Sequence, residues 1–539
     1  MKVLLTALSA KAIHKTLAPW CLKAYCDMHV PNCEILVQEH TVNDHLHDIV
    51  KEIYLSAPDV VGFSLYIWNI EHTVKVATIL RKYLPHCIIV FGGPEVSFET
   101  DTDAYPMADY IIQGAGEQAL ASLLTQLHTG AKISERMLAS PIAVALNDLP
   151  DPYTEAYVKS FAMGRMQKIA HQLVYFESSR GCPFSCTYCL SSRFHGVDEL
   201  SLELVFKRLD ALCAAGAKCI KFVDRTFNAN KKRAQAILQY ILAKETTCTF
   251  HFEVAADLFD ETLLALIAQM PKERVQFEIG IQSINGQTLA EIDRVMDIKR
   301  VLDTVKTLVS YGNCHIHVDL IAGLPFETLD SFSKGIDACI LAKPQMLQLG
   351  FLKLLKGTKI REQRDDYGYV FSDFAPYEVL CSNSMNFDEM LKLAEIEAVV
   401  DKFYNSGVYT HCIDYLLTHV FRRPYDLFSA LADFCRGGNP KLSQKHAYTL
   451  LYDFLCEHTS AQWAAHVVKL DCLTYYAKPV LPDEIAIHRD KKAEVEFKKS
   501  RQPHYQNVRI EYFPLDERTR VFIYDEACAI TRAHKVLEQ

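Results

Sequence analysis

Long apolar runs are missing from this chain of 539 residues. No stretch reaches the length of about 18 apolar residues that a membrane-spanning helix needs, so we expect no membrane span. The first residues contain only a brief apolar run and no signal-peptide cleavage pattern, which favours a cytoplasmic protein. The eighteen cysteines are scattered rather than spaced as a disulfide framework. We therefore expect reduced thiols, as in a cell that lives with little oxygen.

An excess of positive charge is also missing. The net charge is −9, which gives no general attraction to nucleic acid or to an anionic membrane surface, so a nucleic-acid partner is disfavoured. The motifs G-x-S-x-G, P-loop and H-E-x-x-H do not occur, which argues against the hydrolases and nucleotide-binding enzymes that carry them. The chain shows no internal repeat, and its length predicts about two to four domains.

Residues 1–135 alternate between strand-like and helix-like segments. This alternation predicts a parallel, doubly wound, Rossmann-like sheet. The following segment, 136–168, contains Pro150 and Pro152 and is interpreted as an interdomain linker. The expected strands of the first domain are residues 2–8, 34–40, 59–67, 87–93 and 108–114, and the expected helices are 17–29, 73–84 and 116–130.

Residues 169–365 alternate again, and their six strand–helix repeats predict a partial (β/α)6 barrel, in which ligands bind at the carboxyl ends of the strands. Residues 366–539 have mostly helical periodicity and end in an expected β-hairpin that turns near Asp516. We interpret this part as a mainly α domain of unknown function. The expected barrel strands are residues 173–179, 219–224, 249–255, 275–283, 315–323 and 346–352.

The most informative motif is C-x3-C-x2-C, formed by Cys182, Cys186 and Cys189. Thiolates suit an iron–sulfur cluster or zinc. Three cysteines can hold three irons of a [4Fe–4S] cubane and leave the fourth iron open. Structural zinc would need a fourth protein ligand, usually from a second C-x2-C pair, and the chain has no such pair.

With the aromatic Tyr188 before its third cysteine, and after the first barrel strand, this motif resembles the signature of the radical S-adenosylmethionine (SAM) superfamily. The resemblance implies that the open iron is chelated by the amino and carboxylate groups of SAM. One electron then cleaves a sulfur–carbon bond, giving methionine and a 5′-deoxyadenosyl radical that abstracts a hydrogen atom from an unactivated carbon. An electron donor such as flavodoxin or ferredoxin would be a partner.

Polar residues at the ends of the later barrel strands are the candidates for SAM binding. The stretch 275–294 resembles the family branch of the oxygen-independent coproporphyrinogen oxidases and the methylthiotransferases, which implies that Gln282 and Ser283 lie at SAM and that Arg294 pairs with its carboxylate. Gly323 would let the backbone approach the adenine. A structural role is the alternative for each residue. The candidates are Asp224, Glu253, Glu278, Gln282, Ser283, Arg294 and Gly323.

The first domain resembles the cobalamin-binding domain of the B12-dependent radical SAM branch. The resemblance implies that Ser64 and Gly92-Gly93 flank the dimethylbenzimidazole tail, because a hydroxyl can cap a ring nitrogen and glycines leave a slot. The domain departs from the D-x-H-x-x-G pattern, so His14 is either a cobalt ligand or a loop histidine. The candidates are His14, Ser64, Trp68, Asn69, Gly92, Gly93, Pro94, Glu95, Gly114, Gly116 and Glu117.

Both resemblances together cover residues 1–360 and imply a B12-dependent radical SAM enzyme. The expected reaction is methylation of an unactivated carbon of an unknown small-molecule or peptide substrate: one SAM methylates cob(I)alamin and another supplies the radical. The alternatives are a radical cyclisation or rearrangement without methyl transfer, and a non-catalytic corrinoid or cluster sensor. The first domain could also be a relic that no longer binds B12.

Overall fold

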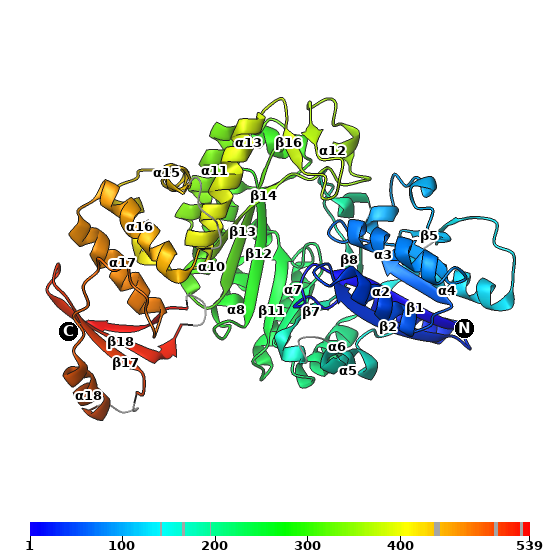
Figure 1. Cartoon of the computed structure of the whole chain (residues 1–539), viewed down its shortest axis with the longest axis horizontal. Helices are drawn as coiled ribbons and strands as arrows, with labels where there is room; N and C mark the ends of the chain where they lie inside the picture. The colour runs from blue at the N-terminus through cyan, green and yellow to red at the C-terminus, as the bar shows by residue number, and fades with distance from the viewer. Residues whose placement is uncertain are drawn as a thin grey trace. The chain divides into compact units, whose positions relative to one another are not determined.

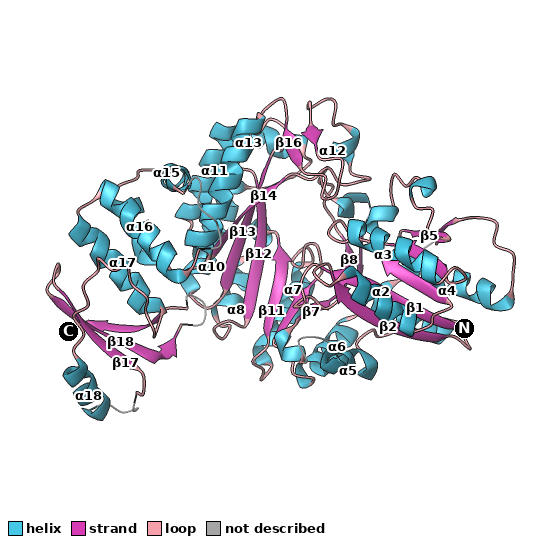
Figure 2. Cartoon of the chain, in the orientation of Figure 1, coloured by secondary structure: helices cyan, strands magenta, loops and turns pink. Residues whose placement is uncertain are grey.

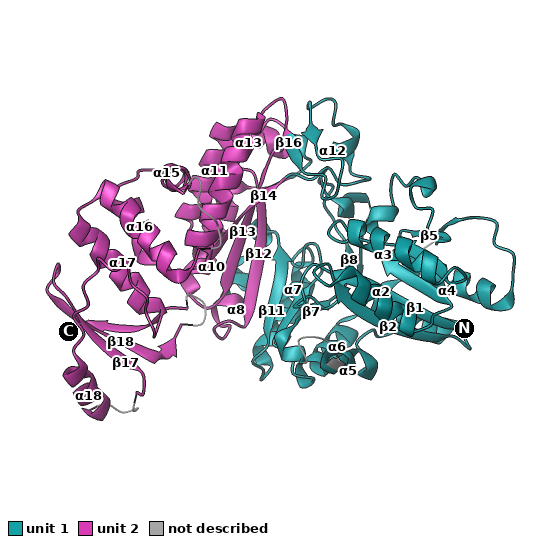
Figure 3. Ribbon diagram, in the orientation of Figure 1, with its two compact units in different colours: residues 1–266, 291–294, 352–380 teal, residues 267–290, 295–351, 381–539 magenta. Residues whose placement is uncertain are grey.

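The computed structural model describes residues 1–140, 143–163, 168–193, 196–435, 442–500, 505–528 and 532–538. The chain divides into two compact units (Figure 3). Unit 1 comprises residues 1–266, 291–294 and 352–380, and unit 2 comprises residues 267–290, 295–351 and 381–539. No helix within the described ranges has the length and apolarity that crossing a bilayer requires.

The first part of unit 1 is a sheet of six parallel strands in the order β2-β1-β3-β4-β5-β6. Its strands β1, β2 and β5 are labelled in Figure 1. Helices α1 and α4 contact each other, and so do α2 and α3, whose apolar side chains share a core with β3 and β4. The doubly wound sheet is thereby confirmed. The elements are β1 Lys2–Ser9, α1 Ala18–His29, β2 Glu34–Thr41, α2 Leu46–Leu55, β3 Val60–Ser64, α3 Ile70–Tyr83, β4 Ile88–Gly92, β5 Tyr110–Gln113, α4 Gly116–Thr129 and β6 Met137–Ala139.

The strand order reverses between β1 and β3, which lie side by side. In open α/β sheets, ligands bind outside the carboxyl ends of the strands at such a reversal. The expected linker is not without structure, because β6 extends the sheet and α5 (Glu155–Met163) follows it. Sequence missed β6 because three residues carry too little periodicity to be recognised.

The second part of unit 1 has three parallel strands in the order β11-β10-β7. Two short strands, β8 and β9, pair antiparallel beyond the end of β7. The elements are β7 Leu173–Phe176, β8 Ser179–Gly181, β9 Val197–Glu199, α6 Leu202–Ala214, β10 Cys219–Phe222, α7 Lys231–Ala243 and β11 Thr249–Val254, and the late segment 352–380 adds α12 Lys359–Glu362 and β15 Val370–Phe371.

Unit 2 begins with three further parallel strands in the order β14-β13-β12. Alternate residues of these strands, such as Phe277, Val318 and Leu347, are fully buried. With three strands in each unit, the six parallel strand–helix repeats of the expected partial (β/α)6 barrel are present. The elements are α8 Glu261–Ala268, which begins in unit 1, β12 Val275–Gln282, α9 Gly286–Glu291, α10 Ile298–Tyr311, β13 His315–Ala322, α11 Leu329–Leu341 and β14 Met346–Phe351.

The rest of unit 2 is mainly helical and ends in antiparallel strands, as expected (Figure 2). The terminal hairpin gains a third strand, β19, which pairs with β18. A charged segment near residue 495 forms the helix α18, which buries Glu494 and Phe497. The elements are β16 Val379–Cys381, α13 Phe387–Val399, α14 Thr410–His419, α15 Pro424–Phe434, α16 Gln444–His458, α17 Ala461–Tyr475, α18 Lys491–Ser500, β17 Val508–Phe513, β18 Arg518–Ala527 and β19 His534–Glu538.

Candidate cofactor sites

The three cysteines lie on a loop that is closed at its base by the pairing of β8 with β9. Gly181 faces Val197 in this ribbon and has a φ of 103°. A Cβ atom at Gly181 would lie 2.3 Å from the carbonyl oxygen of Gly196, so only glycine fits. The sequence therefore places the first cysteine directly after a glycine because the ribbon requires it.

Backbone hydrogen bonds anchor the middle of the cysteine loop. The amide of Thr187 donates to the oxygen of Ile292 at 3.1 Å, and the oxygen of Thr187 accepts from the amide of Ile360 at 3.1 Å. Cys186 is buried, whereas Cys182 and Cys189 are partly exposed. The three thiols thus have fixed backbone positions on one loop.

The arrangement of possible metal ligands can be stated only for the described residues. Within the described ranges, no three His, Cys, Asp or Glu side chains converge closely enough to hold one metal ion. A tetrahedral ion gathers its thiolates around one centre, whereas a cubane takes each thiolate at a separate iron. The donor chemistry of three thiolates on one loop suits an iron–sulfur cluster.

Arg294 lies beside the cysteine loop, in the short segment 291–294 of unit 1. Its Nη1 atom is 3.7 Å from the Sγ atom of Cys186 and 3.4 Å from the hydroxyl of Tyr188. Burial raises the pKa of the Cys186 thiol, and the positive charge of Arg294 opposes this rise. The structure therefore brings a sequence-derived SAM candidate into contact with the cysteine loop.

Asp224 lies at the end of β10 and is buried. Its Oδ1 atom accepts hydrogen bonds from the amides of Ser178 at 2.9 Å and Ser179 at 3.0 Å, and its Oδ2 atom accepts from the hydroxyl of Ser178 at 2.5 Å. Burial raises the pKa of Asp224 although these bonds lower it. Both carboxylate oxygens therefore hold the backbone that leads into the cysteine loop, and contact with SAM stays a prediction.

Arg233, at the start of α7, completes this support and was not recognised from sequence. It donates from Nη2 to the oxygen of Ser178 at 2.9 Å and from Nη1 to that of Leu200 at 2.6 Å. A basic residue in the first turn of a helix opposes the helix dipole, which is the one local signal that could have drawn attention to it. Glu253, at the end of β11, is partly exposed and lies 3.9 Å from the amino group of Lys221.

Gln282 stands at an irregularity in unit 2. The pairing of β12 with β13 shifts register between Gly280 and Gln282, and Gln282 has a φ of 69°. Such bulges often re-aim a side chain at a functional site. The Oε1 atom of Gln282 is buried and accepts no hydrogen bond from the described residues. This acceptor is thus available to a ligand.

Ser283 and the loop after β13 are joined by Glu327. The Ser283 hydroxyl donates to one carboxylate oxygen of Glu327 and accepts from the amide of Asn285 at 2.9 Å, while Ser331 donates to the other oxygen of Glu327. Burial raises the pKa of Glu327. Ser283 is thereby used to connect two loops of unit 2. Gly323, at the head of the second loop, has a φ of 87°, a backbone conformation that favours glycine.

Glu278 belongs to a polar face of the unit 2 strands. Glu278 pairs in register with His317, and Asp319 pairs with Gln348. Gln276 Nε2 lies 2.9 Å from His317 Nε2. The residues between them on each strand are buried and apolar. A barrel interior that served only as a core would carry Val, Ile and Leu, so this face suits a polar ligand.

His14 lies in the loop after β1, which belongs to the strand-order reversal. Its Nδ1 atom is 2.9 Å from the Tyr175 hydroxyl on β7, and it forms a backbone bridge with Leu173. Burial lowers the pKa of His14, and Lys11 and Lys221 lower it further. The lowered pKa favours a neutral imidazole, and its Nδ1 atom is already engaged by the Tyr175 hydroxyl.

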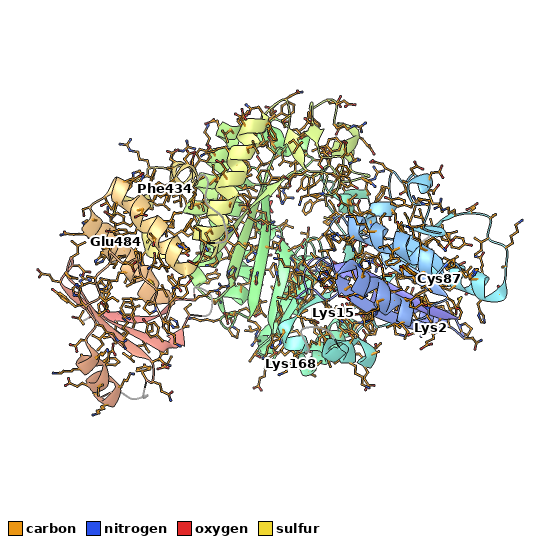
Figure 4. All side chains as sticks on the ribbon, in the orientation of Figure 1. Lys2, Lys15, Cys87, Lys168, Phe434 and Glu484 are labelled. Atoms are coloured by element: carbon orange, nitrogen blue, oxygen red, sulfur yellow. The ribbon has the colours of Figure 1, made fainter. Side chains whose placement is uncertain are left out.

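The neighbouring Lys15, labelled in Figure 4, anchors the same loop. Its buried amino group is ion-paired with Glu39. It also lies over the rings of Trp20, Tyr157 and Phe161 at 5.5, 5.8 and 4.8 Å from their centroids. Charge pairing and cation–π contact offset the desolvation of this lysine. The loop that carries His14 is therefore anchored by the contacts of His14 with Tyr175 and of Lys15 with Glu39.

The loop after β3 uses its candidate Asn69 for the fold. Asn69 is fully buried, and its amide nitrogen donates to the oxygens of Leu8 at 3.0 Å and Ser64 at 3.1 Å. Its side chain therefore joins the ends of β1 and β3. Trp68 is 48% exposed and stacks on Tyr66 at 4.4 Å, so its ring can meet a ligand. The Ser64 side chain is buried at the end of β3.

The glycine pair after β4 divides into two cases. Gly93 has a φ of 105°, and a Cβ there would lie 2.5 Å from the oxygen of Leu65. A Cβ at Gly92 would meet only ordinary contacts at 3.7 Å. The fold itself therefore requires Gly93, whereas Gly92 is the position where the absence of a side chain can serve a ligand. Pro94 follows, and Glu95 is buried and accepts from Tyr377 Oη at 2.8 Å.

The remaining candidates surround the start of α4. Gly114 has a φ of 71°, and Gly116 would bring a Cβ within 3.1 Å of Leu22. Glu117 is buried and is paired with Nη2 of Arg180 at 3.0 Å. Arg180 also pairs with Glu177 at 2.9 Å and stands two residues before Cys182. Sequence reasoning missed Arg180, whose position beside the motif was the available signal.

Three family models match consecutive parts of the chain. The B12 binding domain matches residues 3–124, and the Radical SAM superfamily matches residues 176–338. A family described as a protein of unknown function, DUF4080, matches residues 365–534. The first two matches cover the segments that hold the two sets of candidate residues.

The chain is also similar to named proteins. An uncharacterized methyltransferase of Pyrococcus horikoshii is 28% identical over 54% of this chain and 67% of that protein. The cobalamin-dependent radical SAM methyltransferase TokK of Streptomyces tokunonensis is 24% identical over 70% of this chain and 62% of that protein. The alignments therefore span about two thirds of the length of these relatives.

Among solved structures, the apo form of the cobalamin-dependent S-adenosylmethionine radical enzyme OxsB is similar in fold. It has a TM-score of 0.60 and 16% identity, and the match covers 87% of this chain and 78% of that one. This likeness supports the succession of a doubly wound domain, a partial barrel and a further domain.

Proposed function

Because the chain belongs to the radical SAM enzymes that carry a cobalamin-binding domain, we propose that it methylates an unactivated carbon of its substrate. The cofactors of this family are a [4Fe–4S] cluster, SAM and cobalamin. When bound, the cluster supplies the electron that cleaves SAM, and cobalamin carries the methyl group. The protein's own residues hold these groups and place them relative to the substrate.

The observation that carries the proposal is the cysteine loop. Cys182, Cys186 and Cys189 stand on a loop that is closed at its base and anchored in its middle, with Arg294 beside Cys186. We propose that the three thiolates hold the cluster and that Arg294 binds the carboxylate of SAM, because a guanidinium matches a carboxylate in charge and geometry. Asp224 would keep the entry to the loop in place.

We assign the further contacts with SAM within unit 2. The unused acceptor of Gln282 supports a hydrogen bond to a donor of SAM. The backbone at Gly323 would approach the adenine, and Ser283 would keep this loop in position through Glu327. Glu278 here, and Glu253 in unit 1, remain candidates for the hydroxyl or amino groups of SAM.

We propose that cobalamin binds at the carboxyl ends of β1, β3, β4 and β5. The strand-order reversal and the exposed Trp68 ring support this placement, as does Gly92, a glycine that the fold itself does not require. Tyr175 occupies one nitrogen of His14, so only the other nitrogen remains for cobalt. The proposal does not require His14 to be a ligand.

Beside Glu278, the polar residues Gln276, His317 and Asp319 support a substrate with polar groups, such as a hydrophilic small molecule or a peptide, rather than a hydrocarbon. We propose a cytoplasmic location, because the eighteen cysteines are scattered rather than spaced as a disulfide framework. A flavodoxin or ferredoxin would supply the electron.

The test is anaerobic purification and reconstitution with iron, sulfide and hydroxocobalamin, followed by reduction with SAM. Iron, cobalt, 5′-deoxyadenosine and methionine are measured for the wild type and for the triple variant Cys182→Ala, Cys186→Ala, Cys189→Ala. We expect the variant to lose iron and SAM cleavage but to retain cobalt. Iron unchanged by the triple substitution would contradict the cluster assignment.

Deuterium-labelled SAM methyl groups separate the reaction classes once a converted substrate is found. Transfer of the label to a product carbon supports methylation. Formation of 5′-deoxyadenosine with an unlabelled, rearranged product would instead indicate cyclisation or rearrangement. Cobalt that binds without any SAM cleavage would point to a sensor.

A further inference from the structure

Residues 354–377, here called the strap, follow the last barrel strand in the chain but pack within unit 1. Their second half falls in the family match of unknown function, which begins at residue 365. Their contacts reach two loops that the proposed function uses for different cofactors.

The first set of contacts reaches the loop after β4, which begins with Gly92-Gly93. The carboxylate of Glu99 accepts from the amide of Gly357 at 2.8 Å and from Nε of Arg361 at 2.9 Å. Gly357 has a φ of 80°, and a Cβ there would lie 2.4 Å from the ring of Phe98. The backbone of the strap at Gly357 thus packs directly against the ring of Phe98, with no room for a side chain between them.

Arg361 organises the strap itself. It donates from Nη1 to the oxygen of Leu354 at 2.6 Å, and its guanidinium lies over the rings of Phe371 and Tyr377 at 5.3 and 5.1 Å. Tyr377 in turn donates to the buried Glu95 at 2.8 Å. One cation therefore links both ends of the strap to the loop after β4.

The second set of contacts reaches the cysteine loop and its neighbour. The amide of Ile360 donates to the oxygen of Thr187, which lies between Cys186 and Tyr188. Lys359 forms an ion pair at 3.0 Å with Asp293, which is the residue before Arg294. Three adjacent residues of the strap, 359 to 361, therefore contact the two loops.

We propose that the strap sets the position of cobalamin relative to the cluster, with Glu99 and Arg361 as positioning residues. The inference rests on the proposed function. Transfer of a methyl group demands close placement of the two reacting centres, and a misplacement of about 1 Å can cost about a hundredfold in rate. A short covalent segment that binds both loops restricts this distance more firmly than contact between the loops alone.

The experiment compares cluster-loaded wild type with Arg361→Met, Glu99→Gln and Arg361→Lys. Three quantities need no substrate: the Kd of hydroxocobalamin from its absorbance, the rate of 5′-deoxyadenosine formation without cobalamin, and the rate of methyl transfer from SAM to reduced cobalamin. The electron paramagnetic resonance spectrum of cob(II)alamin reports its surroundings. Lys159→Met, which removes a cation from an exposed pair in the same unit, is the control.

We expect Arg361→Met and Glu99→Gln to keep their iron and to form 5′-deoxyadenosine at the wild-type rate. The Kd of cobalamin should rise and methyl transfer should fall, each by about tenfold, with an altered cob(II)alamin spectrum. Arg361→Lys should restore part of both, because it keeps the charge. A general loss of folding would instead lower iron and SAM cleavage together.

Two outcomes overturn the inference: variants that bind cobalamin and transfer methyl groups like the wild type, or variants that lose iron and cobalamin in parallel with no rescue by lysine. Failure of the proposed function looks different. In that case the wild type itself binds no cobalamin or transfers no methyl group.

Discussion

Arg294 places a permanent positive charge 3.7 Å from the Cys186 thiol, where it opposes the rise in the thiol's pKa that burial causes. Its planar guanidinium offers five N–H groups in a fork whose geometry matches a carboxylate. Binding of a carboxylate by Arg294 would depend on the geometry of the guanidinium as well as on its charge. A lysine at this position would supply only the charge.

We therefore expect Arg294→Lys to keep its iron but to bind SAM about tenfold more weakly, since the fork is lost. Equilibrium dialysis of SAM against the cluster-loaded protein under anaerobic conditions measures the effect. Arg422→Lys, at an exposed position of unit 2, is the matched control. Equal SAM affinity in Arg294→Lys and the wild type would exclude a carboxylate contact.

Asp224 shows how a buried carboxylate can serve a site without touching its ligand. Asp224→Asn replaces one acceptor oxygen with a donor that faces the donors of Ser178 or Ser179. We expect a loss of about 1–3 kcal/mol in the free energy of unfolding and a lower iron content after reconstitution. Thermal unfolding and iron analysis test this, with the exposed Asp148→Asn as the control. Normal iron content in Asp224→Asn would show that the loop does not depend on this carboxylate.

At the scale of elements, the β8–β9 ribbon decides whether the cysteine loop keeps its ends together. Gly181→Ala forces a Cβ against the oxygen of Gly196 at a left-handed backbone position. We expect the ribbon to open, with a cost of about 1–3 kcal/mol and reduced iron uptake. Iron per chain and the absorbance of the cluster measure this.

The control for the ribbon is Gly286→Ala, because a Cβ at that glycine meets no atom within 4 Å. It should leave iron uptake unchanged. If both alanine variants took up iron like the wild type, the ribbon would not be needed for the cluster.

A second element-scale effect concerns α14 and α17 in unit 2. The carboxylate of Asp471 accepts hydrogen bonds from the amides of His411 and Cys412, at the start of α14, each at 2.8 Å. Burial raises the pKa of Asp471 to about 7, although these hydrogen bonds lower it. Between about pH 4 and pH 7 the folded chain therefore holds a proton here that the unfolded chain has released.

As a result, this group makes the free energy of unfolding fall as the pH rises from about 4 to about 7. Asp471→Asn should remove that part of the slope. Urea unfolding followed by circular dichroism at several pH values tests it, with Asp303→Asn at an exposed ion pair as the control. An unchanged slope in Asp471→Asn would mean that Asp471 is ionised throughout this range.

At the scale of the whole molecule, the chain's order and its compact units do not coincide. Residues 291–294 and 352–380 belong to unit 1 although they follow parts of unit 2 in the chain. Both segments contact the cysteine loop, through Ile292 and Ile360. The proposed cluster and cobalamin residues therefore all lie in unit 1.

A ligand that binds only the folded state stabilises it, by about 2.7 kcal/mol at a hundred times its Kd. We expect hydroxocobalamin at that concentration to slow hydrogen exchange in β1 to β5 and in the strap. The amides of α16 and α17 should serve as the internal control and change little. Protection limited to the C-terminal helices would place cobalamin elsewhere.

Local patterns of the amino-acid sequence were enough to predict several features of this protein. Alternating apolar segments predicted both parallel sheets, because burial on a strand or helix follows a short period. The spacing of Cys182, Cys186 and Cys189 revealed the cluster motif, because one loop contains all three ligands. The Gly-Gly pair after a predicted strand also singled out Gly93. The structure shows that the fold itself requires this glycine, because its backbone lies close to that of Leu65.

The residues that meet across long separations became known only from the folded chain. The contacts of Asn69 with Leu8, of Arg180 with Glu117 and of Arg361 with Glu99 join residues 61, 63 and 262 positions apart. The periodic pattern of apolar residues along a segment cannot predict such contacts, because they depend on how whole elements pack. For the same reason the uses of Asn69 and Asp224 within the fold, and the link that the strap makes between two loops, emerged only from the tertiary structure.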